Sequence, residues 1–299
     1  MERVGVEYQL MFAQALNARG GATLRFEPVR GGVISWNTYA PGGTLRFRVL
    51  RAGMPASAWY DYAQWQSSGR KSFSPTSDRD GITVDVDVLS AEQPFDGIEL
   101  AAEEIDFSLL AFAAPQRPQA SLPYAGDAMI LDVPARTQYV LEEERGWCSA
   151  ASLSMVNAYH GIDRPVEETA RAVLDRAYNG TGNWAFNTAY SGSLGLRAAV
   201  AYLQNLDQAA RLIERNIPLV ISYSWREGEL PGAPLPHSDG HLAVLSGFTE
   251  NGDCAMNDPA APSVRVVYPR SAIEAIWQRN NGVAYVVAPA GLDYASVLA

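Results

Sequence analysis

The sequence predicts a multidomain protein, with an all-β domain over residues 1–117 followed by an α+β domain over residues 125–299. Two observations support this prediction. Up to residue 117, short segments of alternating polar and apolar residues are separated by clusters of Gly, Pro, Ser and Asp, which is typical of antiparallel strands joined by turns. Beyond residue 125, segments with helical periodicity come first and strand-like segments follow, the order expected of an α+β domain. Gln116–Gln119 is the expected boundary.

The all-β domain is expected to be a jelly-roll-like sandwich of antiparallel strands with one polar face. The alternation is clearest in Thr44–Leu50 and Ile82–Val88. Trp36, Trp59 and Trp65 add large aromatic side chains to this region. Because each such side chain buries a large area, we favour a role in the core, and the alternative is a face that binds a carbohydrate or protein ligand.

In the α+β domain, apolar residues recur at intervals of three and four, which predicts helices. The segments with this pattern are 149–159, 165–177, 194–203 and 208–215. The polar and aromatic segment Gly180–Asn187 is expected to be a loop between two of the helices. Later apolar runs predict an antiparallel sheet. These runs are 219–223, 241–248, 252–259, 264–268 and 283–287.

Cys148 directly precedes the first predicted helix and is the candidate nucleophile of the chain. A helix N-terminus carries partial positive charge and free N–H groups, which stabilise a thiolate and lower the pKa of a cysteine. The alternative is a small buried cysteine that fills the core. Two neighbours argue against that alternative, since Gly146 predicts a turn and Trp147 predicts an aromatic wall beside the thiol.

His241 is the candidate base. It is one of three histidines and opens an apolar strand, and the next strand carries Asp258. A carboxylate there can accept the imidazole N–H and fix its tautomer. The register depends on the turn between the two strands. A turn centred on residues 249–250, which we predict, places Asp258 opposite His241, whereas a turn at residues 251–252 places it opposite Leu245.

Cys148, His241 and Asp258 follow one another in the order of nucleophile, base and orienting group that papain-like proteases have. In those enzymes the tetrahedral oxyanion is held by the backbone N–H of the cysteine and by a glutamine amide just upstream. Gln138 is the only glutamine between Ser121 and Cys148, so it is the candidate oxyanion residue.

The motifs around these residues carry a resemblance to a known family. They are Val133-Pro134 through Gln138, Gly146-Trp147-Cys148-Ser149, Ser154-Met155-Val156, Gly182–Asn187, Gly240-His241 and Asn257-Asp258-Pro259. With them the chain resembles the family-39 cysteine peptidases of the bacteriocin-processing type, and in particular their stand-alone bacterial branch, in which some members have an N-terminal β-rich domain. The resemblance implies a papain-like fold and a peptide or protein substrate. It also implies amide hydrolysis by Cys148, His241, Asp258 and Gln138.

The segment Gly180–Asn187 is interpreted either as a packed surface loop or as a rim of the substrate cleft, because loops over clefts commonly carry specificity. Trp184 and Asn187 are therefore candidate substrate-binding residues. Trp147, beside the thiol, is a third candidate.

Two other interpretations of the cysteines and histidines are weaker. Cys148 and Cys254 could form a disulfide, but a chain of this size does not need one to secure its core. His237 and His241 have the spacing of two zinc ligands on a helix, yet the intervening Ser238–Gly240 predicts a loop, and no further ligand cluster completes a site. The sequence therefore predicts neither a metal site nor a cofactor.

The composition limits the partners. A formal net charge of −10 argues against nucleic acid, because phosphate binding depends on clustered cations. No apolar run approaches the roughly 18 residues that a membrane span needs. The first residues lack the charged-then-apolar layout of a signal peptide, so a cytoplasmic location is the default expectation, and an extracellular one stays open if a leader is missing.

The predicted function is hydrolysis of peptide bonds by a cysteine-type peptidase. The same thiol, imidazole and carboxylate could instead transfer the acyl group to an amine, as in transglutaminase-like enzymes. A third hypothesis is a catalytically silent binding protein in which the β-sandwich recognises the ligand. The presence of all four candidate residues favours the peptidase.

Overall fold

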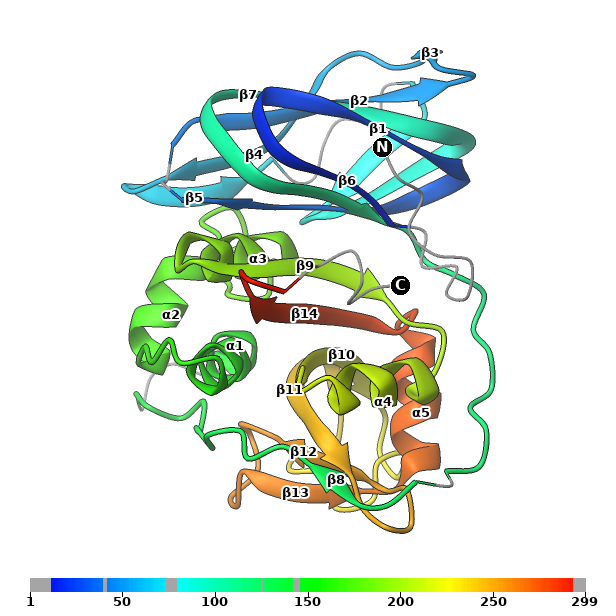
Figure 1. The fold of residues 1–299 in the computed structure, drawn as a ribbon, viewed down its shortest axis with the longest axis vertical. Coiled ribbons are helices and arrows are strands. Elements are labelled where there is room, and N and C mark those ends of the chain that lie inside the picture. Colours follow the sequence, from blue (N-terminus) through cyan, green and yellow to red (C-terminus); the bar gives the residue numbers. More distant parts are fainter. Residues whose placement is uncertain (1–11, 40–41, 74–79, 125, 142–145, 293–299) are drawn as a thin grey trace. The chain divides into compact units, whose positions relative to one another are not determined.

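The computed structural model describes residues 12–39, 42–73, 80–124, 126–141 and 146–292 (Figure 1). These residues are mostly β-structure, in two antiparallel sheets with few helices. The chain divides into two compact units. The first contains residues up to 115 and residues 172–200, and the second contains residues 116–171 and 201–292.

The sheet of the first unit is built around two long strands, β1 (Phe12–Thr38) and β7 (Val88–Ala113). The end of β7 pairs with two separate parts of β1, since Ala113 is aligned with both Phe12 and Val33. The sheet order is β1-β7-β2-β4-β5, with β3 paired to β2 and β6 paired to β7. The shorter strands are β2 (Thr44–Arg51), β3 (Met54–Pro55), β4 (Tyr60–Gln66), β5 (Gly69–Ser72) and β6 (Ile82–Asp85).

Aromatic side chains form much of the core of this unit. Trp36 and Trp65 are completely buried, and their rings meet edge to face with centroids 6.0 Å apart. Both rings also contact Phe186, at 6.0 and 5.6 Å. These contacts confirm the core interpretation for Trp36 and Trp65. Trp59 stays 37% exposed, with the Arg48 guanidinium over its ring.

Phe186 belongs to α3 (Trp184–Ser193), which packs against β1. The predicted loop over Gly180–Asn187 is therefore wrong in its second half, because the helix already begins at Trp184. The side chain of Asn183 accepts a hydrogen bond from the Phe186 N–H (2.9 Å) and caps the helix. Asparagine is a favoured N-cap residue, so this signal was present in the sequence.

The predicted helix at 194–203 is also wrong, because β9 (Leu196–Tyr202) occupies most of it. The segment is rich in alanine and has high helix propensity, but tertiary contacts override propensity here. Gly195 adopts a φ of +93° and separates β9 from α3. Asn37 then binds the strand backbone at Ala198, donating to the carbonyl oxygen (2.7 Å) and accepting from the N–H (3.0 Å). The chain passes from the first unit to the second within β9.

The other sheet has the order β13-β12-β11-β10-β14-β9, with β8 paired to β11, and all of its strands except most of β9 belong to the second unit. Its strands are β8 (Met129–Ile130), β10 (Leu219–Trp225), β11 (Ser238–Phe248), β12 (Cys254–Asn257), β13 (Arg265–Tyr268) and β14 (Val283–Pro289). The helices are α1 (Cys148–Tyr159), α4 (Leu206–Glu214), α5 (Arg270–Arg279) and most of α2 (Val166–Val173). Helix α1 lies on one side of β10 and β11, and α4 and α5 lie on the other (Figure 1).

The strands predicted for this region and the helices predicted at 149–159 and 208–215 are confirmed by β10 to β14, α1 and α4. Helix α2 ends earlier than predicted, at Val173. Helix α5 was not predicted. Its buried residues Ile273, Ile276 and Trp277 have the three- and four-residue spacing of an amphipathic helix, so the signal was available.

The hairpin of β11 and β12 has neither of the two registers considered from the sequence. Val244 is aligned with Asn257, and the register shifts by one residue between Leu245 and Gly247. The turn closes with a hydrogen bond from the Gly252 N–H to the Thr249 carbonyl oxygen (2.8 Å). The prediction that Asp258 lies opposite His241 in the ladder is therefore wrong. The turn at Thr249–Gly252 and the bulge between Leu245 and Gly247 together set a register between the two that the sequence suggested.

Candidate active site

Helix α1 places Cys148 at its first residue, directly beside β11. The hydroxyl of Ser152, one turn further along the helix, donates to the Leu242 carbonyl oxygen (3.0 Å) and ties α1 to this strand. The small side chains of Ala150 and Ala151 are completely buried and let the helix pack closely. Cys148 as a residue keeps part of its surface exposed at the start of the helix.

The imidazole of His241 is held on β11 by two aromatic rings from β10. His241 is aligned with Tyr223 in the β10–β11 pair and is only 3% exposed. The rings of Tyr223 and Trp225 both meet the imidazole edge to face, with centroids 5.5 Å away. Trp225 is in turn fixed by a hydrogen bond from its Nε1 to the Leu235 carbonyl oxygen (3.1 Å).

Asp258 receives hydrogen bonds on both carboxylate oxygens. Its Oδ1 accepts from His241 Nε2 (2.8 Å) and from the Ala260 N–H (2.9 Å), and its Oδ2 accepts from the Tyr268 hydroxyl (2.8 Å). Since Nε2 donates to Asp258, Nδ1 is the nitrogen left for a second partner. The Cys148 thiol is close enough to the imidazole for each group to shift the pKa of the other. The side chains thus come into contact even though the predicted ladder register is wrong.

The three groups shift one another's ionisation. Burial acts to raise the pKa of the Cys148 thiol, but the hydrogen bond and charge of His241 and two backbone N–H groups bring this pKa below its ordinary value. Burial acts to lower the pKa of His241, but its bonds to Asp258 and Cys148 raise it to about 10. Burial acts to raise the pKa of Asp258, but the bond and charge of His241 lower it. The lowered pKa of Cys148 and the raised pKa of His241 favour a thiolate beside an imidazolium at neutral pH.

Gln138 lies in the segment between β8 and α1, close to the residues around Asp258. Its backbone N–H donates to the Pro259 carbonyl oxygen (3.0 Å), and the side-chain amide of Asn257 donates to the Val133 carbonyl oxygen (3.0 Å). The Oε1 atom of Gln138 is buried and has no hydrogen-bond partner among the described residues. Of the two polar atoms of this amide, Nε2 is the one that can donate a hydrogen bond.

The three candidate substrate-binding residues lie in different places. Trp147 is the N-cap residue of α1 and is half-buried beside Cys148. Trp184 and Asn187 belong to α3 in the first unit. Asn187 is completely buried, and its amide donates to the carbonyl oxygens of Thr181 (2.8 Å) and Asn183 (2.7 Å).

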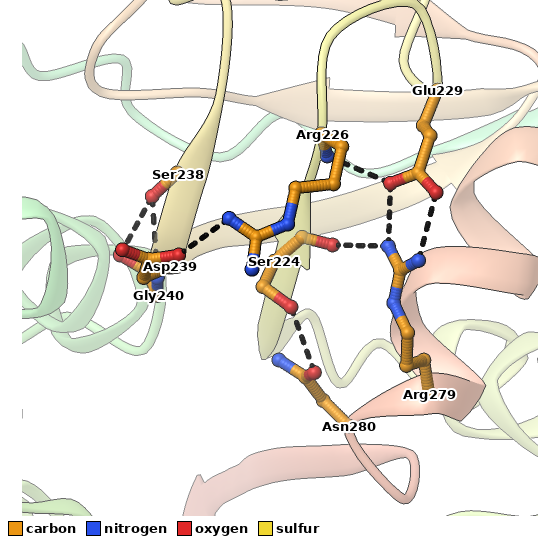
Figure 2. Close-up of polar contacts among 8 residues, drawn as sticks. All are labelled: Ser224, Arg226, Glu229, Ser238, Asp239, Gly240, Arg279 and Asn280. Carbon is orange, nitrogen blue, oxygen red and sulfur yellow. Dashed lines mark hydrogen bonds and ion pairs between the residues drawn. The ribbon is translucent and has the colours of Figure 1, made fainter.

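The connection that leads from β10 into β11 is held by ionic contacts (Figure 2). Arg279, the last residue of α5, donates to both carboxylate oxygens of Glu229 (2.8 and 2.7 Å) and to the Ser224 carbonyl oxygen (2.9 Å). The Arg226 N–H donates to Glu229 (2.7 Å), and its guanidinium binds Asp239 (2.9 Å). Arg279 lowers the pKa of Glu229 to about 2. The loop is thereby fastened to α5 and to the start of β11.

The second cysteine, Cys254, differs from Cys148 in its surroundings. Cys148 and Cys254 are both free thiols. Cys254 is completely buried, and burial raises its pKa to about 12, so it is not a nucleophile at neutral pH. Within the described parts of the chain, no group of three or more His, Cys, Asp or Glu side chains could hold a metal ion. None of the helices described there is long and apolar enough to span a membrane.

Comparison with known proteins adds the family. A crystal structure of a C39-like peptidase from Bacillus anthracis is similar to this chain at 18% identity, with a TM-score of 0.41, over 55% of this chain and 98% of that one. A double glycine motif protease from an AMS/PCAT transporter, in complex with a leader peptide, is similar at 20% identity, with a TM-score of 0.36, over 55% and 99%. The peptidase domain of Streptococcus ComA is similar at 14% identity, with a TM-score of 0.37, over 52% and 97%. No protein among curated sequences matches significantly.

The sequence model of the Peptidase_C39 like family matches residues 130–285, which is more than half of the chain. The match includes Gln138, Cys148, His241 and Asp258. The chain therefore belongs to the Peptidase_C39 like family, and it is a cysteine-type peptidase.

Proposed function

We propose that the chain hydrolyses peptide bonds with Cys148 as nucleophile, His241 as acid and base, Asp258 as orienting group and Gln138 as oxyanion donor. The observation that carries this proposal is the chain of contacts from the Cys148 thiol through the imidazole to the Asp258 carboxylate, with 2.8 Å between Nε2 and Oδ1. A buried carboxylate that fixes the imidazole, and an imidazole that ionises a thiol at a helix N-terminus, are the requirements of thiol catalysis.

The reaction proceeds in two stages. The Cys148 thiolate attacks the carbonyl carbon of the substrate, and the backbone N–H of Cys148 and the Gln138 amide stabilise the negative oxygen. The imidazolium of His241 gives its Nδ1 proton to the leaving amine, and the acyl group stays on sulfur as a thioester. Water then attacks the thioester while His241 Nδ1 takes up the proton. The acid is released, the thiolate is regenerated and the imidazolium is restored.

We also propose the domain organisation expected from the sequence, with an accessory β-rich domain over residues 1–117 and a papain-like peptidase domain over residues 125–299. The family match over residues 130–285 supports the second range. Residues 172–200 belong to the matched sequence but pack with the first unit, so the accessory sheet and the peptidase sequence share this segment. On this proposal Trp147, half-buried beside Cys148, contacts the peptide or protein substrate. Asn187 is left out of the proposal, because it is completely buried and its amide is bonded to two carbonyl oxygens.

Alkylation and product analysis test the proposed function. Because the thiol is ionised by His241, we expect iodoacetamide at pH 6 to modify Cys148 faster than free cysteine, while buried Cys254 stays unmodified. A mixed peptide library should be cleaved by the wild type and by Cys254→Ser, but not by Cys148→Ser, as mass spectrometry would detect. Cleavage by Cys148→Ser would contradict the proposal. Amide products formed only with added amines would indicate acyl transfer instead of hydrolysis.

A further inference from the structure

Tyr268 is the last residue of β13, and its hydroxyl binds the carboxylate oxygen of Asp258 that does not face the imidazole. It is aligned with Cys254 in the β12–β13 pair and is only 1% exposed. Its hydroxyl donates to Asp258 Oδ2 at 2.8 Å, while the other oxygen, Oδ1, faces His241 and the Ala260 N–H. The two oxygens of the carboxylate therefore have separate partners.

A buried carboxylate is stable only when donors satisfy its oxygens. Asp258 is completely buried, and Tyr268 is the one hydrogen-bond donor to Oδ2 that the described residues provide. Without this donor, the carboxylate could turn about its side-chain bonds to offer Oδ2 to other groups, and Oδ1 would lose its fixed direction toward Nε2.

A second buried phenol shows that proximity alone does not explain the contact. Tyr223 is completely buried, and its ring meets the His241 imidazole edge to face with centroids 5.5 Å apart, so it lies at the same site. Its hydroxyl has no hydrogen-bond partner among the described residues. Of these two phenols, only that of Tyr268 is aimed at the carboxylate.

We propose that Tyr268 is a positioning residue of the peptidase site, which holds Asp258 so that Oδ1 is directed at His241 Nε2 and the thiolate–imidazolium pair is maintained. This inference rests on the proposed function of Cys148, His241 and Asp258. Tyr268 touches neither substrate nor sulfur in this role and acts through Asp258.

The test is the pH dependence of Cys148 alkylation by iodoacetamide, a measurement that needs no substrate. It is made on the full chain with Cys254→Ser, so that Cys148 is the thiol that reacts. In Tyr268→Phe the carboxylate loses the donor that fixes its direction, so the imidazolium is held less firmly beside the thiolate and the pKa of Cys148 rises. We expect the acid limb of the alkylation rate to move to higher pH by about one unit, the size of one hydrogen bond to a charged group. The matched control is Tyr62→Phe, which removes a buried hydroxyl that donates to the carbonyl oxygens of Ile34 and Asp87 in the first unit.

A double variant separates action through Asp258 from general loosening. In an Asp258→Asn background, Tyr268→Phe should cause no further shift of the acid limb. An unshifted limb in Tyr268→Phe, or an equal shift in Tyr62→Phe or in the Asp258→Asn background, would overturn the inference while leaving an activated Cys148 in place. If the wild-type thiol itself reacts with the pH dependence of free cysteine, the proposed function fails, and the inference fails with it. The two failures are thus distinguishable.

Discussion

His241 is the most constrained side chain of the candidate site. Its Nε2 is committed to Asp258, and its ring meets the neighbouring rings of Tyr223 and Trp225 edge to face. The Nδ1 atom is therefore presented to the thiol in one orientation. A base held in this way needs little rearrangement when the proton moves, which is the physical basis of preorganised catalysis.

Gln138 allows the oxyanion role to be tested separately from the ion pair. Because its amide would contact only the developing oxyanion, Gln138→Ala should lower kcat for peptide cleavage by about two to three orders of magnitude. The alkylation rate of Cys148 should stay unchanged, since Gln138 is not bonded to the thiol or to the imidazole. Near-wild-type turnover in this variant would remove Gln138 from the mechanism.

Among the secondary-structure elements, α3 depends on a carboxylate from a distant strand connection. Asp87, between β6 and β7, is 3% exposed, and its Oδ2 accepts a hydrogen bond from the Ala185 N–H (3.0 Å) in the first turn of α3. Burial raises the pKa of Asp87 to about 7, although backbone N–H groups of α3 oppose this shift. The helix start is thus coupled to the protonation of a buried side chain in the same unit.

This coupling predicts how stability changes with pH. The folded-state pKa of Asp87 lies above its ordinary value of 3.8, so the folded chain binds the extra proton between the two values. The contribution of Asp87 to the free energy of unfolding should therefore fall as pH rises toward 7, by on the order of 2–3 kcal/mol between pH 5 and pH 8. Urea denaturation at both pH values measures this fall.

Two variants isolate the Asp87 contribution from that of other titrating groups. Asp87→Asn cannot titrate and should lose this part of the pH dependence. The matched control is Asp85→Asn, which alters an exposed carboxylate on β6 and should keep it. The same pH dependence in wild type and Asp87→Asn would contradict the prediction.

The chain as a whole does not divide at a single point. Residues 172–200 lie within the family match but pack with the N-terminal sheet through Phe186, which contacts Trp36 and Trp65, and through the Asn37 bonds to Ala198. We therefore expect a truncated chain of residues 118–299 to leave α3 without its packing partners. Its thermal unfolding, followed by circular dichroism, should lose the cooperativity of the full chain. Cooperative unfolding at the same temperature would contradict this expectation.

How much the sequence could predict depended on whether the signal was local. Cys148 before a helical run, the apolar strand behind His241 and the aromatic core around Trp36 are local patterns, and each led to the observed element or burial. The register predicted for β11 and β12 was wrong because a bulge leaves no clear trace in the hydrophobic alternation of the sequence. The helix predicted over 194–203 was wrong because Asn37, far away in sequence, binds the backbone of the strand that forms there, at Ala198. Tyr268 was missed for the same reason, since only folding brings it to Asp258.

The path of the chain between the two units has an evolutionary consequence. Because it crosses from one unit to the other after residues 115, 171 and 200, no single proteolytic cut could release either unit intact. Recombination of a continuous gene segment could not transfer one unit without also transferring part of the sequence of the other unit. Changes in the N-terminal sheet near α3 should then be inherited together with compensating changes inside the peptidase sequence, as they are in an obligate pair.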